Sequence, residues 1–191
     1  MNADKAPPST AASDPRGWVR PLLRTRQVRE FTDEPIQDDV IDAMLEVARW
    51  SGSSRNEQPW RFVLIRDAAT IARLAAAGMP QTRLLHTAPA AIAIVLPDEP
   101  DRAVSRAFDD GRVAERLLIA AGMLDIAAGI AWIRGDVRPA IREALGLPDG
   151  WLVRTIVGLG HPTAAARTPK SAPGEARRPL EELVHRERWS G

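Results

Sequence analysis

Residues 90–96 read AAIAIVL, an uninterrupted apolar run that directly follows Pro89. A short apolar run bounded by turn residues is typical of a strand that is buried on both faces. The segments 61–66 (RFVLIR) and 154–159 (RTIVGL) are also short and rich in β-branched residues, and they predict two further strands. Residues 132–133 suggest another short extended piece. We therefore expect one sheet with residues 90–96 as a central strand.

Segments with helical periodicity separate these strands. Helices are expected over 18–28, 38–50, 68–77, 101–128 and 136–147, with a short one starting at Pro179. Asp38 or Asp39 is the expected N-cap of the second helix, and Asp136 that of the fifth. No internal repeat is visible in the sequence. Strands that alternate with helices favour an α/β or α+β sandwich around one mixed sheet.

The composition bounds the class of protein. A chain of 191 residues with 45% hydrophobic and 27% charged residues fits one globular domain. Its net charge of +1 gives no general attraction to nucleic acid or to an anionic membrane. Cysteine is absent, which fits a cytoplasmic location. Residues 1–17 are rich in Ala, Pro, Ser and Asp and have no apolar segment, so we expect a disordered tail rather than a signal peptide.

Common catalytic motifs are missing from the sequence. The three histidines, His86, His161 and His185, are far apart and form no metal-binding motif, and no GxSxG, GxGxxG or Walker A sequence is present. The chain also has no tyrosine. An enzyme with so few reactive side chains is expected to take its chemistry from a cofactor.

Two arginine groups are candidate phosphate sites. Arg24, Arg26 and Arg29 precede a turn at Pro35, and Arg177 with Arg178 precedes the last predicted helix. Arginine side chains that converge can bind a phosphate through charge-assisted, bidentate hydrogen bonds. The alternative for both groups is a solvated basic surface. A third unusual feature is the loop SGSSRNEQPWRF (51–62), which is longer and richer in hydrogen-bonding side chains than a simple turn.

Five motifs occur in a fixed order along the chain. They are RQVREFTDEP (26–35), SSRNEQPWRF (53–62), DDGRVAERLLIAAGMLDIAAGIAWI (109–133), LGLP followed by LGHP (145–148 and 159–162), and RRPLEE (177–182). In this order they resemble the FMN-dependent nitroreductase family, over most of the chain from about residue 20 to 189. The sequence is similar to a compact member, without the larger lid of some relatives.

The resemblance implies an α+β fold, with a central mixed, mainly antiparallel sheet flanked by helices in a three-layer sandwich. It implies one domain over residues 18–191, whose C-terminal extension (161–191) reaches the partner subunit of a homodimer. Two FMN molecules would lie at the dimer interface, and no metal is implied.

The resemblance also implies which residues bind the flavin. Arg26, Gln27 and Arg29, with Arg177, would hold the phosphate, and Ser53, Ser54 and Asn56 would come from the partner. The segment Trp132, Ile133, Arg134 and Gly135 would lie beside the flavin ring, with the backbone N–H groups of Arg134 or Gly135 near N5 and O4. No side chain is implied as catalytic, since the chemistry would occur at flavin N5. Trp60 is expected to be a core anchor.

Several residues depart from the family pattern. Gln27 stands where serine is frequent, and Gly52 replaces the usual proline before the serines. Trp132 occupies a position where a smaller residue or proline is found in some members, and Glu175 one where a cation is common. These changes predict a looser loop, a weaker phosphate clamp and a narrower pocket.

The expected function is that of an oxidoreductase that takes a hydride from NAD(P)H and reduces nitroaromatic, quinone or similar acceptors by a ping-pong mechanism. One alternative is a flavin-dependent relative with a different reaction, such as flavin cleavage or dehalogenation. The other is a flavin-binding dimer without catalytic activity.

Overall fold

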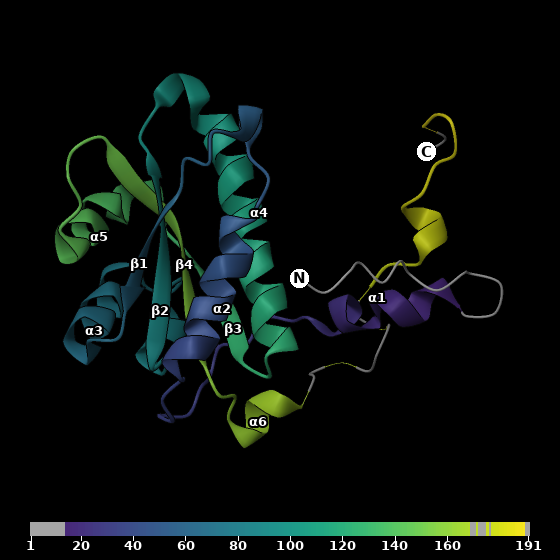
Figure 1. The fold of residues 1–191 in the computed structure, drawn as a ribbon, viewed down its shortest axis with the longest axis horizontal. Coiled ribbons are helices and arrows are strands. Elements are labelled where there is room, and N and C mark those ends of the chain that lie inside the picture. Colours follow the sequence, from purple (N-terminus) through teal and green to yellow (C-terminus); the bar gives the residue numbers. More distant parts are fainter. Residues whose placement is uncertain (1–13, 169–170, 172–174, 176, 190–191) are drawn as a thin grey trace, which may run out of the picture.

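The computed structural model describes residues 14–168, 171, 175 and 177–189. A four-stranded sheet in the order β1-β2-β4-β3 forms its centre (Figure 1). The strands are β1 (Arg61–Ile65), β2 (Ala90–Pro97), β3 (Ala127–Trp132) and β4 (Trp151–Gly160). All three strand pairings are antiparallel. The central place of residues 90–96 and the α+β class expected from the sequence are confirmed.

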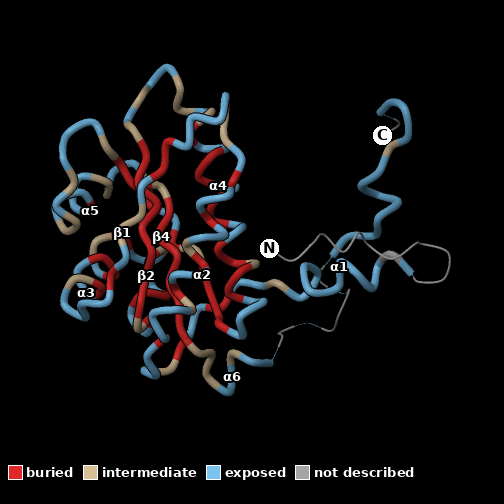
Figure 2. Tube along the Cα trace, in the orientation of Figure 1, coloured by how far each residue is buried: buried red, intermediate tan, exposed pale blue. Residues whose placement is uncertain are grey.

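Two layers of helices cover the sheet. The helices α2 (Asp38–Arg49) and α4 (Ala103–Met123) pack on one face, and α3 (Ala68–Ala77) and α5 (Arg138–Leu145) on the other. Alternate residues of β2 divide between the layers, because Ile92 and Ile94 join the first core and Ala91 and Ala93 the second. Figure 2 shows β2 and β4 buried between the helical layers, whereas most of the edge strand β1 is exposed or half-buried.

The helix starts differ from two of the expected N-caps. The N-cap of α2 is Gln37, and neither Asp38 nor Asp39 occupies that position. Asp136 does not cap α5, whose N-cap is Val137. Asp136 lies instead in the 3-10 turn η4 (Gly135–Val137), where its carboxylate pairs with Arg134 at 2.7 Å. This local ion pair draws the carboxylate away from the helix end.

The helix predicted over 101–128 was too long at its C-terminal end. The helix α4 ends at Met123, and Asp125 then adopts φ 58°, a left-handed conformation that stops helical hydrogen bonding. The chain turns back there and forms β3, which pairs with β4 over its full length. The residues 127–131 are four small residues and one isoleucine, so their β-propensity was weak and the pairing with β4 determined their structure.

Residues 25–32 run along the outer edge of β3. The N–H of Val28 donates to the carbonyl of Ala128 at 2.8 Å. The N–H of Thr32 donates to the carbonyl of His161, also at 2.8 Å. A Cβ atom on Gly129 would lie 2.1 Å from the Val28 carbonyl oxygen, so only glycine allows this close approach. The segment is thereby fixed against the sheet.

The two ends of the described chain project from this body. The helix α1 spans Pro15–Arg24, earlier than the predicted 18–28 and starting within residues 1–17, which were expected to be disordered. Residues 1–13 of that expected tail lie outside the described residues. After β4 come the short helix α6 (Ala164–Arg167) and the 3-10 turn η5 (Leu180–Glu182), shown in yellow beyond α1 in Figure 1. Three further 3-10 turns are η1 (Ser54–Asn56), η2 (Arg83–His86) and η3 (Pro100–Arg102). Among the described residues no helix is long and apolar enough to cross a membrane.

Candidate functional site

The loop between α2 and β1 brings Ser53, Ser54 and Asn56 together. The Ser53 hydroxyl accepts a hydrogen bond from the Gln58 N–H at 2.9 Å, and the Gln58 side chain donates to Oδ1 of Asn56 at 3.3 Å. Arg55, Asn56 and Gln58 have φ values of 53°, 54° and 49°. Non-glycine residues in this left-handed region are uncommon and cluster at functional sites. The loop therefore has a specific, strained conformation.

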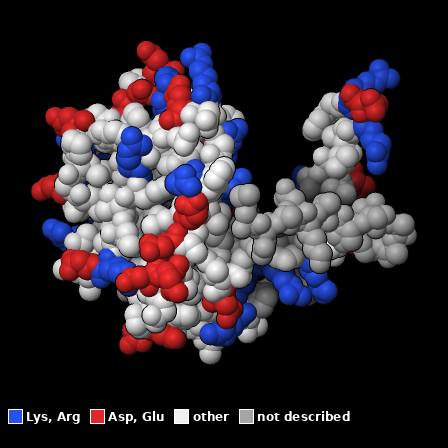
Figure 3. All heavy atoms as spheres, in the orientation of Figure 1, with Lys and Arg blue, Asp and Glu red and all other residues white. Residues whose placement is uncertain are grey.

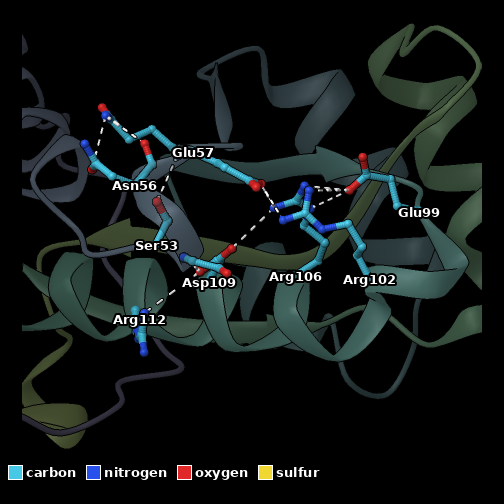
Figure 4. Close-up of polar contacts among 10 residues, drawn as sticks. Ser53, Asn56, Glu57, Glu99, Arg102, Arg106, Asp109 and Arg112 are labelled. Carbon is cyan, nitrogen blue, oxygen red and sulfur yellow. Dashed lines mark hydrogen bonds and ion pairs between the residues drawn. The ribbon is translucent and has the colours of Figure 1, made fainter.

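The long helix α4 supports this loop from below. The Ser54 N–H donates to Oδ1 of Asp109 at 3.3 Å, and Asp109 is only 1% exposed. A second buried charge, Arg106, places its Nη1 3.6 Å from Oδ2 of Asp109. Figure 4 shows both side chains pointing from α4 toward the loop. An ion pair of two buried side chains thus lies directly beneath Ser54.

The same charges also hold the end of the loop. Oε2 of Glu57 accepts from Arg102 at 2.5 Å and from Arg106 at 3.1 Å, and Arg106 also binds Glu99 at 2.6 Å (Figure 4). The hydrogen bond from Arg102 lowers the pKa of Glu57 below its usual value. Glu57 is therefore ionised at neutral pH and tied to α4.

The first arginine group borders a small pocket at the other end of α4. This pocket of about 160 Å³ is lined by Arg24, Arg26 and, from α4, Leu118 and Gly122. Nη2 of Arg26 donates to the carbonyls of Ala166 and Arg167. These contacts place the Arg26 guanidinium at the point where the chain leaves β4.

The neighbours of Arg26 have different surroundings. Oε1 of Gln27 accepts from the backbone N–H of Ile130 at 3.3 Å, so this side chain is attached to the edge of β3. Arg29 is exposed. The structure thus brings Arg26 and Gln27 to one edge of the sheet, with Arg29 exposed on the same segment.

The end of β3 has an exposed ring, and the residue after it has a buried side chain. Trp132 is 54% exposed, whereas Ile133 is fully buried. The N–H of Ile133 donates to the backbone carbonyl of Arg154 at 2.8 Å. Arg134 binds Asp136 and, at 3.1 Å, Oε1 of Gln81. Within the described residues the N–H groups of Arg134 and Gly135 make no hydrogen bond, so both donors remain available. Because it is fully buried, Ile133 is not accessible to a ligand in the single chain.

One protomer does not bring all the predicted site residues together. Ser54 binds α4 at Asp109, whereas the Arg26 pocket reaches Gly122, 13 positions later in the helix. Thirteen residues of α-helix rise about 20 Å. Arg177 belongs to the C-terminal segment, which projects from the body beyond α1 (Figure 1). The loop that carries Ser53, Ser54 and Asn56 (the serine loop) is therefore separate, within a single chain, from the pocket lined by Arg24 and Arg26 (the arginine pocket).

Sequence reasoning missed Arg106 and Asp109. A signal was present, because both continue the stripe of α4 that carries Val113 and Leu117, at spacings of three and four residues. Charged residues in such a stripe face inward and need partners. Trp60 is buried in the core between α2 and α4, as the sequence predicted. The described residues contain no group of side chains suited to a metal ion.

Comparison with known proteins gives a consistent result. Residues 22–85 match the model of the nitroreductase family. A protein of Archaeoglobus fulgidus, named as a candidate NADH dehydrogenase/NAD(P)H nitroreductase, is 29% identical over 177 residues, covering 90% of this chain and 98% of that protein.

Solved structures show the same fold. An FMN-dependent nitroreductase from Clostridium difficile superposes with a TM-score of 0.78 at 21% identity, covering 88% of this chain and 98% of the other. An NADPH:FMN oxidoreductase from Vibrio harveyi, complexed with NAD+, gives a TM-score of 0.75 at 21% identity, covering 91% and 78%. At this identity the superpositions establish the architecture.

Proposed function

We propose that this chain, which matches the nitroreductase family model over residues 22–85, is a member of that family and an FMN-dependent oxidoreductase. It takes a hydride from NAD(P)H and reduces nitroaromatic, quinone or similar organic acceptors in a ping-pong reaction. The observation that carries the proposal is the loop of Ser53, Ser54 and Asn56, held by buried charges in a conformation that it would not adopt without support.

The residues present fit the proposed cofactor. Arginine guanidinium groups suit a phosphate, and Arg26 and Arg29 lie on one fixed segment beside β3. The N–H donors of Arg134 and Gly135 suit the polar edge of a flavin ring, and Trp132 offers an exposed aromatic surface beside them. FMN, when bound, supplies the acceptance and transfer of the hydride. The protein's part is to bind and orient it.

We propose that the site is completed in a homodimer. The serine loop and the arginine pocket of one chain lie at opposite ends of α4, so they fit two sites that each combine residues of two chains. Beside the loop, α4 exposes Val104 (73%) and Phe108 (65%). Phe108 and Gly52 line a groove of about 650 Å³. Exposed apolar surface of this kind is typical of an interface between subunits.

In this dimer the domain spans residues 18–191. The C-terminal extension (161–191) would reach the partner subunit, because its Leu180 and Leu183 are exposed in the single chain. In that arrangement Arg177 would reach the FMN phosphate bound at the partner subunit, rather than one bound at its own protomer. On the face shown in Figure 3, basic and acidic side chains are interspersed, which fits a small-molecule substrate better than nucleic acid.

The test is to add FMN to the purified protein and to follow the visible absorbance of the flavin anaerobically with NADH or NADPH. Bleaching by either nucleotide, followed by recovery when a quinone or nitroaromatic is added, is the expected result. A yellow protein that neither nucleotide bleaches would indicate a non-catalytic flavoprotein. A protein that takes up no FMN would refute the proposal.

A paired substitution tests the phosphate clamp. Replacing Arg26 and Arg177 with alanine should abolish FMN retention during gel filtration, because both guanidinium groups are proposed to meet on one phosphate. Arg73→Ala, in an exposed position of α3, is the control. Unchanged flavin content in the double variant would show that these arginines do not bind the phosphate.

A further inference from the structure

The serine loop has a strained backbone conformation that its own residue types do not favour. Three of its residues, Arg55, Asn56 and Gln58, have positive φ, and glycine occupies none of these positions. Gly52 precedes the serines without the conformational restriction of a proline ring. Sparsely populated backbone conformations persist only where the surrounding structure determines them. The support must therefore come from outside the loop.

Contacts from α4 and its preceding turn supply this support. Asp109 accepts from the N–H of Ser54, which fixes the start of η1. Glu57 is bound by Arg102 and Arg106, which fixes the end of the loop. Arg106 connects the two attachments, because its Nη1 lies 3.1 Å from Glu57 and 3.6 Å from Asp109. The side chain of Arg106 is 3% exposed, so water screens these interactions little.

The attachments leave the predicted ligand-binding groups available. Asp109 binds the backbone of Ser54, and the Ser54 hydroxyl makes no hydrogen bond within the described part of the chain. Asn56 is exposed, and within the described residues its side-chain NH2 group makes no hydrogen bond, whereas its Oδ1 accepts from Gln58. The network thus fixes the backbone of the loop, while the Ser54 hydroxyl and the side-chain NH2 group of Asn56 remain available to a ligand.

We propose that Asp109, Arg106 and Glu57 are positioning residues for cofactor binding. They hold the serine loop of one chain in the conformation that the flavin site of the dimer requires, and they replace the rigidity that a proline at position 52 would give. This inference rests on the proposed FMN-dependent function. None of the three residues needs to touch the flavin.

The sharpest test compares Asp109→Ala with Asp109→Asn. Asparagine retains the Oδ1 acceptor for the Ser54 N–H, and alanine removes it. We expect Asp109→Ala to raise the Kd for FMN at least about tenfold, equivalent to about 1.4 kcal/mol. Asp109→Asn should stay within about threefold of the wild type, by the same relation. At saturating FMN the kcat of both variants should remain close to the wild-type value.

Hydrogen exchange gives a readout that does not depend on flavin. The amide of Ser54 should exchange faster in the flavin-free Asp109→Ala variant, because its acceptor is lost, and should stay protected in Asp109→Asn. Asp149→Asn is the matched control, since it breaks an exposed ion pair with Arg142 away from the loop. It should change neither the exchange at Ser54 nor the Kd for FMN.

A second variant serves if Asp109→Ala does not fold. Glu57→Ala removes the other attachment at a side chain that is 28% exposed, and it should also raise the Kd for FMN several-fold. Wild-type FMN affinity in Asp109→Ala or in Glu57→Ala would overturn the positioning role. A wild-type protein that binds no FMN would refute the proposed function instead, while the exchange at Ser54 would still report whether Asp109 holds the loop.

Discussion

The hydroxyl of Thr155 in β4 donates a 2.6 Å hydrogen bond to Oδ2 of Asp110, which reaches the sheet from α4. Asp110 is 6% exposed, and its Oδ1 is buried without a hydrogen-bond partner among the described residues. Burial raises the pKa of Asp110 to about 6, against the opposing effects of the Thr155 hydrogen bond and the charges of Arg154 and Arg138. Asp110 is thus a buried carboxyl group that is costly to ionise.

Asp110→Asn should stabilise the protein in a pH-dependent way. The folded-state pKa of about 6 lies above the ordinary 3.8, so the folded state retains a proton that the unfolded chain loses. Stability therefore falls as the pH rises from about 4 to about 6 and then stays lowered. The variant should gain up to about 3 kcal/mol near pH 8 and almost nothing near pH 4. Urea unfolding measures this, and an equal gain at both pH values would contradict it.

Thr155→Val should have the opposite effect. It removes the hydroxyl that lowers the pKa of Asp110 and leaves a buried carboxylate without a donor. We expect a loss of about 1–3 kcal/mol in the free energy of unfolding near pH 8. In the Asp110→Asn background the same substitution should cost less, which a double-mutant cycle measures. Equal costs in both backgrounds would show that the two side chains are not coupled.

Gly129→Ala should detach the segment that carries Arg26. Its Cβ would lie 2.1 Å from the Val28 carbonyl, which is backbone and cannot move aside easily. We expect a loss of at least about 2 kcal/mol of stability by urea unfolding, together with weaker FMN binding. The control is Gly17→Ala, because a Cβ there meets no atom within 4 Å. A Gly129→Ala protein as stable as the wild type would contradict the observed approach of Val28 to β3.

Arg106→Met should destabilise the protein far more than Arg49→Met. Arg106 is 3% exposed and faces Glu57, Glu99 and Asp109, so its removal leaves uncompensated acidic groups. A loss of about 3–5 kcal/mol is expected. The pair of Arg49 with Glu46 is 59% and 54% exposed, and breaking it should cost less than about 1 kcal/mol. Similar losses from both substitutions, measured by urea unfolding, would contradict a supporting role of the buried network.

Phe108→Asp should separate the proposed dimer into monomers. It places a charge on the exposed face of α4, where an aspartate in a monomer would be solvated. Sedimentation velocity should show the loss of the dimer, and FMN should be lost with it. Met79→Asp, at a residue 46% exposed in the turn after α3, is the control and should remain dimeric. A dimeric Phe108→Asp protein would place the interface elsewhere.

The sequence predicted the parts of the fold that have strong local patterns. The apolar run of β2, the β-branched β1 and the alanine-rich α3 were found almost to the residue. The boundary between α4 and β3 was missed, because the small residues there pack equally well in helix or strand and only the pairing with β4 decides. The expected cap at Asp136 failed because Arg134 competes for its carboxylate.

The candidate site was partly predictable. The polar residues of the serine loop and the arginines could be selected from motifs, since each is a short stretch of sequence. Asp109 and Arg106 could not be selected in this way, because their partners Ser54 and Glu57 are about 50 residues away in the chain. Their place in the apolar stripe of α4 indicates that they face inward, but nothing local identifies the partners that they meet. Their role follows from where α4 packs.

In the proposed dimer, the separation of the serine loop from the arginine pocket along α4 would link flavin retention to protein concentration. If each site draws on two chains, FMN binds the dimer and hardly binds the monomer. By mass action, dilution then releases the flavin even when its affinity for the dimer is high. Added FMN, in turn, drives association of the chains. An apparent Kd for FMN is thus defined only together with the subunit concentration at which it was measured.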